Sequence, residues 1–278
     1  MSKGILYFAF NNETIDYLKI TEFNYKRAKK HIDVPASIVT SNDCLSTTKA
    51  DLSQFDNIIT MKKTDFQTKI FRNKDDRHKL FWNNNYRTKS YELTPYDETL
   101  LIDSDYIIQS DILNKVWNYY FPLAINSDIK LISNSDISSN EKMLHNSSIK
   151  TYWATVVYFR KSEITKTFFD ILEHVEYNYD YYSRIYHYNK NLFRNDFVFS
   201  IAVHMMNDFN ETNTIPKLPN NTIKLATEKD TIFEITKNTI KFLSTKNDSN
   251  NKTNILPVKT NNDVHITNKL NLLENIGE

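Results

Sequence analysis

Glycine is almost absent from this chain: Gly4 and Gly277 are the only two among 278 residues. The phosphate-binding loops of P-loop and dinucleotide-binding proteins need glycine, because their backbone bends sharply and approaches phosphate closely. The sequence therefore excludes both loop types. If this chain binds a nucleotide, its phosphates must be held in another way, and we expect a metal ion to hold them.

Short apolar runs alternate with helical patterns along the first half of the chain. Strands are expected at 5–10, 36–40, 57–61, 99–102 and 106–108, and helices at about 14–30 and 86–93. Strands that alternate with helices predict an α/β fold with a mostly parallel central sheet flanked by helices.

The second half keeps this alternation less regularly. Strands are expected at 129–133, 154–159, 232–235 and 240–243, and helices at 163–175 and 196–206. Residues 244–262 are polar and rich in Asn, which predicts a surface loop. We expect one domain over 1–278, in which 220–278 forms a C-terminal extension.

Charge and cysteine content limit the class of protein. The 35 Lys and Arg residues balance 34 Asp and Glu, whereas electrostatic nucleic-acid binders normally carry a basic excess. No apolar run is long enough to span a membrane, and no signal-peptide pattern opens the sequence. A single cysteine, Cys44, excludes an intramolecular disulfide, so we expect a cytoplasmic protein.

The run LLIDSD at 100–105 is the sharpest local feature. Asp103 and Asp105 follow three apolar residues of a strand, and ligands of open α/β sheets bind beyond the carboxyl ends of strands. Two carboxylates this close repel each other unless a cation compensates, and such ligands suit Mg²⁺ or Mn²⁺, which can bridge phosphate oxygens. An ordinary turn is the alternative, because Asp-Ser-Asp is also good turn chemistry.

At this point the chain resembles the GT-A nucleotide-sugar glycosyltransferases, most closely the glycogenin-like family 8 and its phage-encoded relatives. That family places apolar-apolar-Asp-x-Asp after a helix with Arg or Lys, as here in YRTK at 86–89 and PYDETLLIDSD at 95–105. The resemblance implies a GT-A, Rossmann-like fold. It also implies that Asp103 and Asp105 bind the metal, with Ser104, Arg87 and Lys89 close to the donor.

A second match, DVHITNK at 263–269, resembles the family's late His motif. By resemblance, His265 is a third metal ligand and Lys269 contacts the diphosphate, so that the extension 220–278 completes the site. A lysine can hold phosphate as a point charge. The spacing departs from the commoner family pattern, in which the lysine follows a glycine.

Three further matches occur in the family's order. FRNDFVF at 193–199 resembles the turn that faces the sugar, which implies a catalytic role for Asn195 and Asp196; either residue is also a good helix N-cap. ATVVYFR at 154–160 corresponds to the strand after the sugar-binding loop, with Ala154 and Thr155 where the family has Asn-x-Gly. The N-terminal match to the nucleoside pocket comprises Ala9, Phe10, Asn11, Asn12 and Tyr17.

Together these matches imply a glycosyltransferase, a hexosyl- or pentosyltransferase, that uses Mn²⁺ or Mg²⁺. It would move a sugar from a nucleotide diphosphate, with UDP expected, to a hydroxyl acceptor with retention. An inverting enzyme would need a carboxylate base, for which Asp136 and Asp196 are the candidates. The acceptor stays open among a glycan, a protein and a modified DNA base. The alternatives are a sugar-nucleotide-binding protein without catalysis and a nucleotidyltransferase that uses the same Asp pair.

Overall fold

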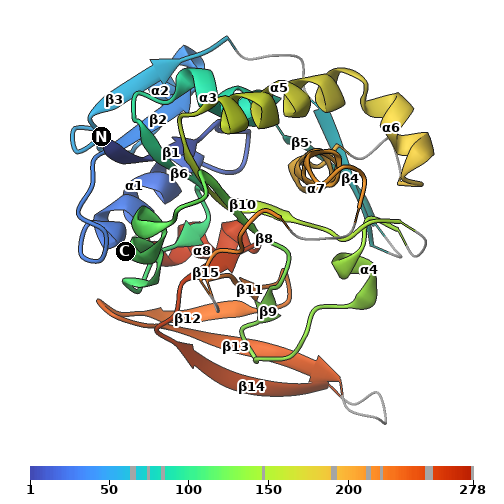
Figure 1. The fold of residues 1–278 in the computed structure, drawn as a ribbon. Coiled ribbons are helices and arrows are strands. Elements are labelled where there is room, and N and C mark those ends of the chain that lie inside the picture. Colours follow the sequence, from blue (N-terminus) through green and yellow to red (C-terminus); the bar gives the residue numbers. More distant parts are fainter. Residues whose placement is uncertain are drawn as a thin grey trace.

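The fold is taken from a computed structural model (Figure 1). The structure describes residues 1–62, 67–73, 76–82, 85–145, 148–188, 193–210, 214–219, 222–247 and 253–276.

A six-stranded sheet forms the centre of the molecule, in the order β3-β2-β1-β6-β10-β8. Its strands are β1 (Lys3–Phe8), β2 (Ala36–Thr40), β3 (Asn57–Thr60), β6 (Glu98–Asp103), β8 (Leu123–Asn126) and β10 (Trp153–Arg160). The first four strands in chain order run parallel, whereas β10 is antiparallel to both of its neighbours. The predicted α/β class with a mostly parallel sheet is therefore confirmed. Its inner strands are continuous apolar runs because both faces of the sheet are covered.

Helices connect and cover these strands (Figure 1). They are α1 (Tyr17–Ala28), α2 (Asn42–Thr47), α3 (Ser90–Leu93), α4 (Ser139–Lys142), α5 (Glu163–Tyr177), α6 (Tyr179–Ile185), α7 (Asn195–Met206) and α8 (Lys269–Ile276), with 3₁₀ turns η1 (Asn85–Lys89) and η2 (Ile112–Asn118). Most of α7 is buried, since it packs between α5 and β10. In the described part of the chain, no helix has both the length and the apolar character that a membrane span requires.

Three smaller sheets complete the fold. One has the order β7-β15-β11-β9, from β7 (Tyr106–Ile107), β9 (Lys130–Leu131), β11 (Lys224–Ala226) and β15 (Val264–Ile266). The others are β12 (Thr231–Ile235), β13 (Ile240–Asn247) and β14 (Thr253–Thr260), and the pair β4 (Gln67–Asn73) and β5 (Asp76–Trp82). The first of these sheets links the C-terminal part of the chain to the end of the central strand β6.

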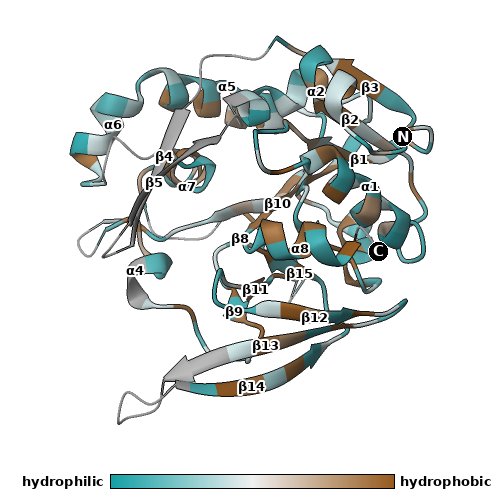
Figure 2. Cartoon of the chain, turned by 180° about the vertical axis from the view of Figure 1, so that it is seen from behind, coloured by the Kyte–Doolittle hydropathy of each residue, from teal (hydrophilic) through white to brown (hydrophobic). Residues whose placement is uncertain are grey.

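The predicted surface loop at 244–262 is wrong. Most of its described residues belong to β13 and β14, which pair antiparallel from Ile240↔Thr260 to Asn247↔Thr253. Apolar and polar residues do not alternate along β14 because both of its faces are exposed to solvent, as the exposed fractions of Ile255 (63%) and Leu256 (45%) show. Figure 2 shows hydrophobic bands on this strand at the edge of the molecule. The predicted strand at 129–133 is likewise shorter, reduced to the two residues of β9.

Gly4 shows why one of the two glycines is needed. A Cβ atom built on Gly4 would lie 2.3 Å from a ring carbon of Tyr96. That ring is buried, and its hydroxyl is 2.7 Å from the Ser37 hydroxyl oxygen, so it cannot move aside freely. Gly277 lies outside the described residues.

We expect Gly4→Ala to lower the free energy of unfolding by about 1–3 kcal/mol, the usual cost of overpacking a core. Urea denaturation measures the change. In the Tyr96→Ala background the same substitution should cost little, because the clashing ring is gone. Equal losses in both backgrounds would contradict the role of Gly4 as space for the ring.

Candidate metal and donor site

The site lies where the strand order of the central sheet changes direction. The chain proceeds from β1 outward to β2 and β3, and then returns on the other side of β1 as β6. Ligands of open α/β sheets bind at such a switch point, beyond the carboxyl ends of the strands. Here the two strand ends lie side by side, with Phe8 paired to Asp103.

The turn between β6 and β7 is fixed from two directions. The Ser104 hydroxyl donates to the Phe8 carbonyl at 3.0 Å, and this side chain is buried. From α1, the Asn24 amide donates to the carbonyls of Tyr106 at 2.5 Å and Ser104 at 3.3 Å. Ser104, predicted to lie near the donor, therefore bonds to β1 through its side chain. The sequence carries no signal for the contribution of Asn24.

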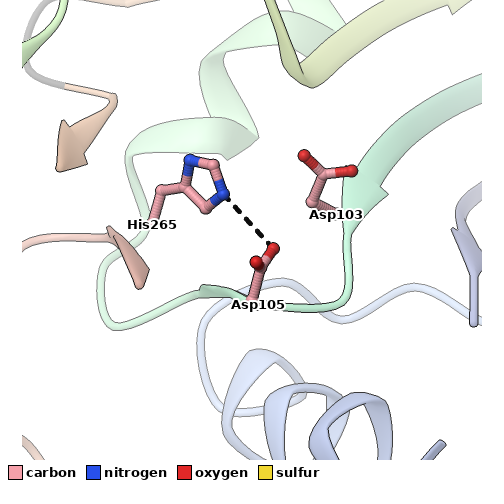
Figure 3. Close-up of side chains that lie close together, drawn as sticks. All are labelled: Asp103, Asp105 and His265. Carbon is pink, nitrogen blue, oxygen red and sulfur yellow. Dashed lines mark ion pairs between the residues drawn. The ribbon is translucent and has the colours of Figure 1, made fainter. Parts of the chain in front are cut away.

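Strand β15 brings His265 to this turn. It pairs antiparallel with β7, which places His265 opposite Tyr106, and Ile266 N–H donates to the Asp105 carbonyl at 2.9 Å. His265 Nε2 lies 3.3 Å from Asp105 Oδ1. One ligand atom from each of Asp103, Asp105 and His265 lies within 4.8 Å of the others (Figure 3). Two motifs that are far apart in the sequence thus converge at one point.

Asp105 is buried between the Lys269 ammonium and the His265 imidazole. Lys269 Nζ, from the first residue of α8, lies 2.8 Å from Oδ2, while His265 faces Oδ1. Burial opposes the charge of Asp105, but Lys269 and His265 outweigh it and hold the pKa of this carboxyl well below its usual range. Burial likewise opposes the imidazolium of His265, yet the Asp105 carboxylate raises the pKa of that ring.

Asp103 is paired with Arg87, a guanidinium that is only 1% exposed. Arg87 lies on η1; one of its terminal nitrogens donates to Asp103 and the other to the carbonyl of Ala154. Desolvation, partly offset by Arg87 and reinforced by the charge of Asp105, raises the pKa of Asp103 to about 6. Arg87 thus links the end of β6 to the start of β10.

The start of β10 forms a second wall of the site. Pairing with β8 shifts register between Trp153 and Val157, so the strand bulges at this point. Ala154 N–H donates to Asp196 Oδ1 at 2.9 Å, and Arg194 donates to Asp196 Oδ2 at 2.8 Å. Both oxygens of Asp196 are therefore engaged by the protein itself.

Thr155, the next residue of the bulge, contacts His265. Its Oγ1 lies 3.2 Å from the imidazole Nδ1, and its side chain is buried. The sequence motifs assign no role to this hydroxyl, because no local pattern relates residues 110 positions apart.

The five residues predicted for the nucleoside pocket lie in different surroundings. Ala9 and Phe10 are buried in the main core, where the Phe10 ring packs on Tyr86 with centroids 6.0 Å apart. The side-chain nitrogen of Asn11 donates to Asp16 Oδ1 at 2.9 Å, and its side-chain oxygen Oδ1 accepts from Leu18 N–H.

Asn12 Oδ1 accepts from the Ile15 and Thr14 N–H groups and so shapes the turn before α1. Tyr17 lies within electrostatic reach of Lys269 and of the two site carboxylates, and burial raises its pKa. Tyr17 therefore lies beside the candidate site.

Three other candidates lie as follows. Lys89 is half-buried, and its Nζ lies 3.9 Å from a carboxylate oxygen of Glu173 on α5. Asp136 is exposed and pairs with Lys142 at 3.1 Å. Asn195 is buried at the first position of α7.

Two carboxylates and one imidazole are a donor set that suits Mn²⁺ or Mg²⁺. The adjacent Lys269 and Arg87 add positive charge for a phosphate ligand. The arrangement can therefore hold a divalent cation together with a diphosphate.

Solved structures similar to this chain include three glycosyltransferases. GlyE from Streptococcus pneumoniae TIGR4 shares 11% identity over 80% of this chain, at a TM-score of 0.43. The galactosyltransferase LgtC, in complex with donor and acceptor sugar analogs, shares 13% over 81%, at 0.44. Mouse xyloside xylosyltransferase 1 shares 9% over 82%, at 0.48.

The chain spans 46% of the GlyE structure, 76% of LgtC and 88% of the mouse protein. No family model matches the sequence, and no curated protein matches it.

Proposed function

We propose that this protein is a metal-dependent glycosyltransferase of the GT-A type, which moves a sugar from a UDP-sugar to a hydroxyl acceptor. One observation carries the proposal: the Asp-x-Asp motif and the late His motif, which the family resemblance assigns to one metal and diphosphate site, lie together in space. They meet at the switch point of an α/β sheet, where nucleotides bind. Residues 220–278 act as the extension that completes this site.

Asp103, Asp105 and His265 would hold the cation, with Mn²⁺ expected. A divalent cation bound there supplies positive charge to the diphosphate that leaves. Lys269 lies at the same place and can exchange its contact with Asp105 for one with a phosphate oxygen. Arg87 keeps Asp103 in position at the end of β6.

During transfer the bond between the sugar C1 and the diphosphate oxygen breaks, and its electron pair leaves with the phosphate. The acceptor oxygen bonds to C1, which is oxocarbenium-like in the transition state. For a retaining enzyme the acceptor proton passes to the departing phosphate. Asn195 and Asp196, at the start of α7, would orient the sugar and the acceptor. Because both oxygens of Asp196 are engaged, we assign it to orientation rather than to proton abstraction.

The proposal is tested by thermal unfolding with UDP, GDP, CDP or ADP, each with and without Mn²⁺. A ligand at about one hundred times its dissociation constant stabilises the folded state by roughly 2.7 kcal/mol. We expect stabilisation by UDP that requires the metal. No shift with any diphosphate would leave Asp103-Ser104-Asp105 as an ordinary turn.

Product analysis then separates the alternatives. Release of UDP from a UDP-sugar with Mn²⁺ is expected of a glycosyltransferase, while a binding protein would show the thermal shift without turnover. Release of pyrophosphate from a nucleoside triphosphate would instead identify a nucleotidyltransferase.

A further inference from the structure

Two residues of β10, Ala154 and Thr155, take no part in the pairing of this strand with β6 or with β8. Val156 is the first residue of β10 paired with β6, and Trp153 is paired with Asn126 of β8. Ala154 and Thr155 lie between Val156 and Trp153 along the chain, and each makes a polar contact with a residue of the candidate site. The Ala154 carbonyl accepts from Arg87, and Thr155 Oγ1 contacts His265. This dipeptide therefore touches both the Asp103 side and the His265 side of the carboxylate–imidazole cluster.

We propose that Thr155 is a positioning residue, which holds the His265 ring so that Nε2 faces the metal site. The inference rests on the proposed function, because it assigns His265 as a ligand. Ala154 and Thr155 occupy the place at which the family that this chain resembles has Asn-x-Gly.

The geometry of the imidazole carries the argument. Nδ1 lies 3.2 Å from Thr155 Oγ1, while Nε2 lies 3.3 Å from Asp105 Oδ1. When Nδ1–H donates to the threonine hydroxyl, the lone pair of the neutral ring stays on Nε2, the nitrogen that faces the carboxylates. The partner of the second nitrogen is what fixes ring orientation and tautomer in metal-binding histidines.

Burial and stiffness make Thr155 suited to this task. Its side chain is 1% exposed, so water does not compete for the imidazole. A β-branched side chain in a strand has restricted χ1 freedom, which keeps the hydroxyl in place. Asp105, Asp103 and Lys269 are the charged groups that act on the His265 ring, and all three belong to the candidate site.

The test compares Mn²⁺ binding, measured without donor by the loss of the free-ion EPR signal, in wild-type protein and variants. Thr155→Val keeps the volume and removes the hydroxyl, and we expect Mn²⁺ affinity to fall by about 10–100-fold. Thr155→Ser restores a hydroxyl and should restore most of the affinity. Thr155→Ala provides a second hydroxyl-free variant in case valine disturbs folding.

Thr151→Val is the matched control. Thr151 is also buried and lies just before the same strand, but its Oγ1 has no hydrogen-bond partner among the described residues. This variant should bind Mn²⁺ as the wild type does. Wild-type affinity in folded Thr155→Val and Thr155→Ala would overturn the assignment.

A second readout needs no metal. In ¹⁵N-labelled protein, the His265 Nδ1 resonance should shift in Thr155→Val and stay in place in Thr151→Val. An unchanged resonance in Thr155→Val contradicts the positioning role alone. Absence of Mn²⁺ binding in wild-type protein contradicts the proposed function instead.

Discussion

Asp105→Asn should abolish the Mn²⁺-dependent stabilisation by UDP and lower sugar-transfer turnover at least 10²–10³-fold, the loss that follows removal of one transition-state electrostatic contact, about 2.7–4 kcal/mol. The carboxylate is buried, lies within reach of Asp103 and His265, and is the partner of Lys269. An amide of the same shape lacks the negative charge that Lys269 and the metal need. Isothermal titration with Mn²⁺ and UDP, beside a UDP-release assay, measures both effects.

Asp97→Asn is the control for this variant. Asp97 immediately precedes β6, at the opposite end from the site, where its carboxylate accepts from Ser2 N–H at 2.8 Å. The same chemical change there should leave metal and donor binding unaltered. Wild-type turnover in a folded Asp105→Asn protein would remove Asp105 from the metal site.

Of the variants described, Arg87→Met should lower the free energy of unfolding most, by about 3–5 kcal/mol, because it removes one partner of a buried ion pair. The substitution leaves Asp103 without its cation and the Ala154 carbonyl without its donor. Exposure of 25% of the Asp103 side chain favours the lower end of this range. Urea denaturation followed by circular dichroism gives the change, and donor binding should be lost as well.

Two further variants separate charge from packing. Lys89→Met, two residues along η1, removes a half-buried cation whose partner, Glu173, is itself partly exposed, and it should change stability by no more than about 1 kcal/mol. The double variant Arg87→Met/Asp103→Asn removes the unpaired charge and should recover part of the stability but not donor binding. A loss in Arg87→Met no larger than that in Lys89→Met would show that the pair does not hold the site together.

The central sheet and the position of the two carboxylates could be predicted because each has a local signal. Buried strands such as β1 and β6 are continuous apolar runs, and the carboxylates of Asp103 and Asp105 stand immediately after one of them. The role expected of His265 rests on a family resemblance rather than on its neighbours in sequence. Its convergence with Asp105 depends on the β7–β15 pairing, which no periodicity in the sequence predicts.

The missed features depend on contacts across the fold. Strand β14 lacks alternation because both of its faces meet solvent at Ile255 and Leu256, so its polar, Asn-rich surroundings predicted a loop. Asn11, which the resemblance places in the nucleoside pocket, bonds through its side chain to Asp16 and to the Leu18 N–H. Asparagine is equally suited to a ligand contact and to a turn, and the residue type alone does not distinguish them.

The pairing of β7 with β15 also has a consequence for the order of folding. The Tyr106 hydroxyl and the Asp263 carboxylate, 157 positions apart, are joined beside this pairing. Closing so long a loop costs conformational entropy before its contacts can compensate, and such non-local contacts slow folding. The four parallel strands β1, β2, β3 and β6 of the central sheet need no residue beyond Asp103, so we expect them to assemble first. The protein should then acquire its affinity for metal in a later kinetic phase than its sheet structure.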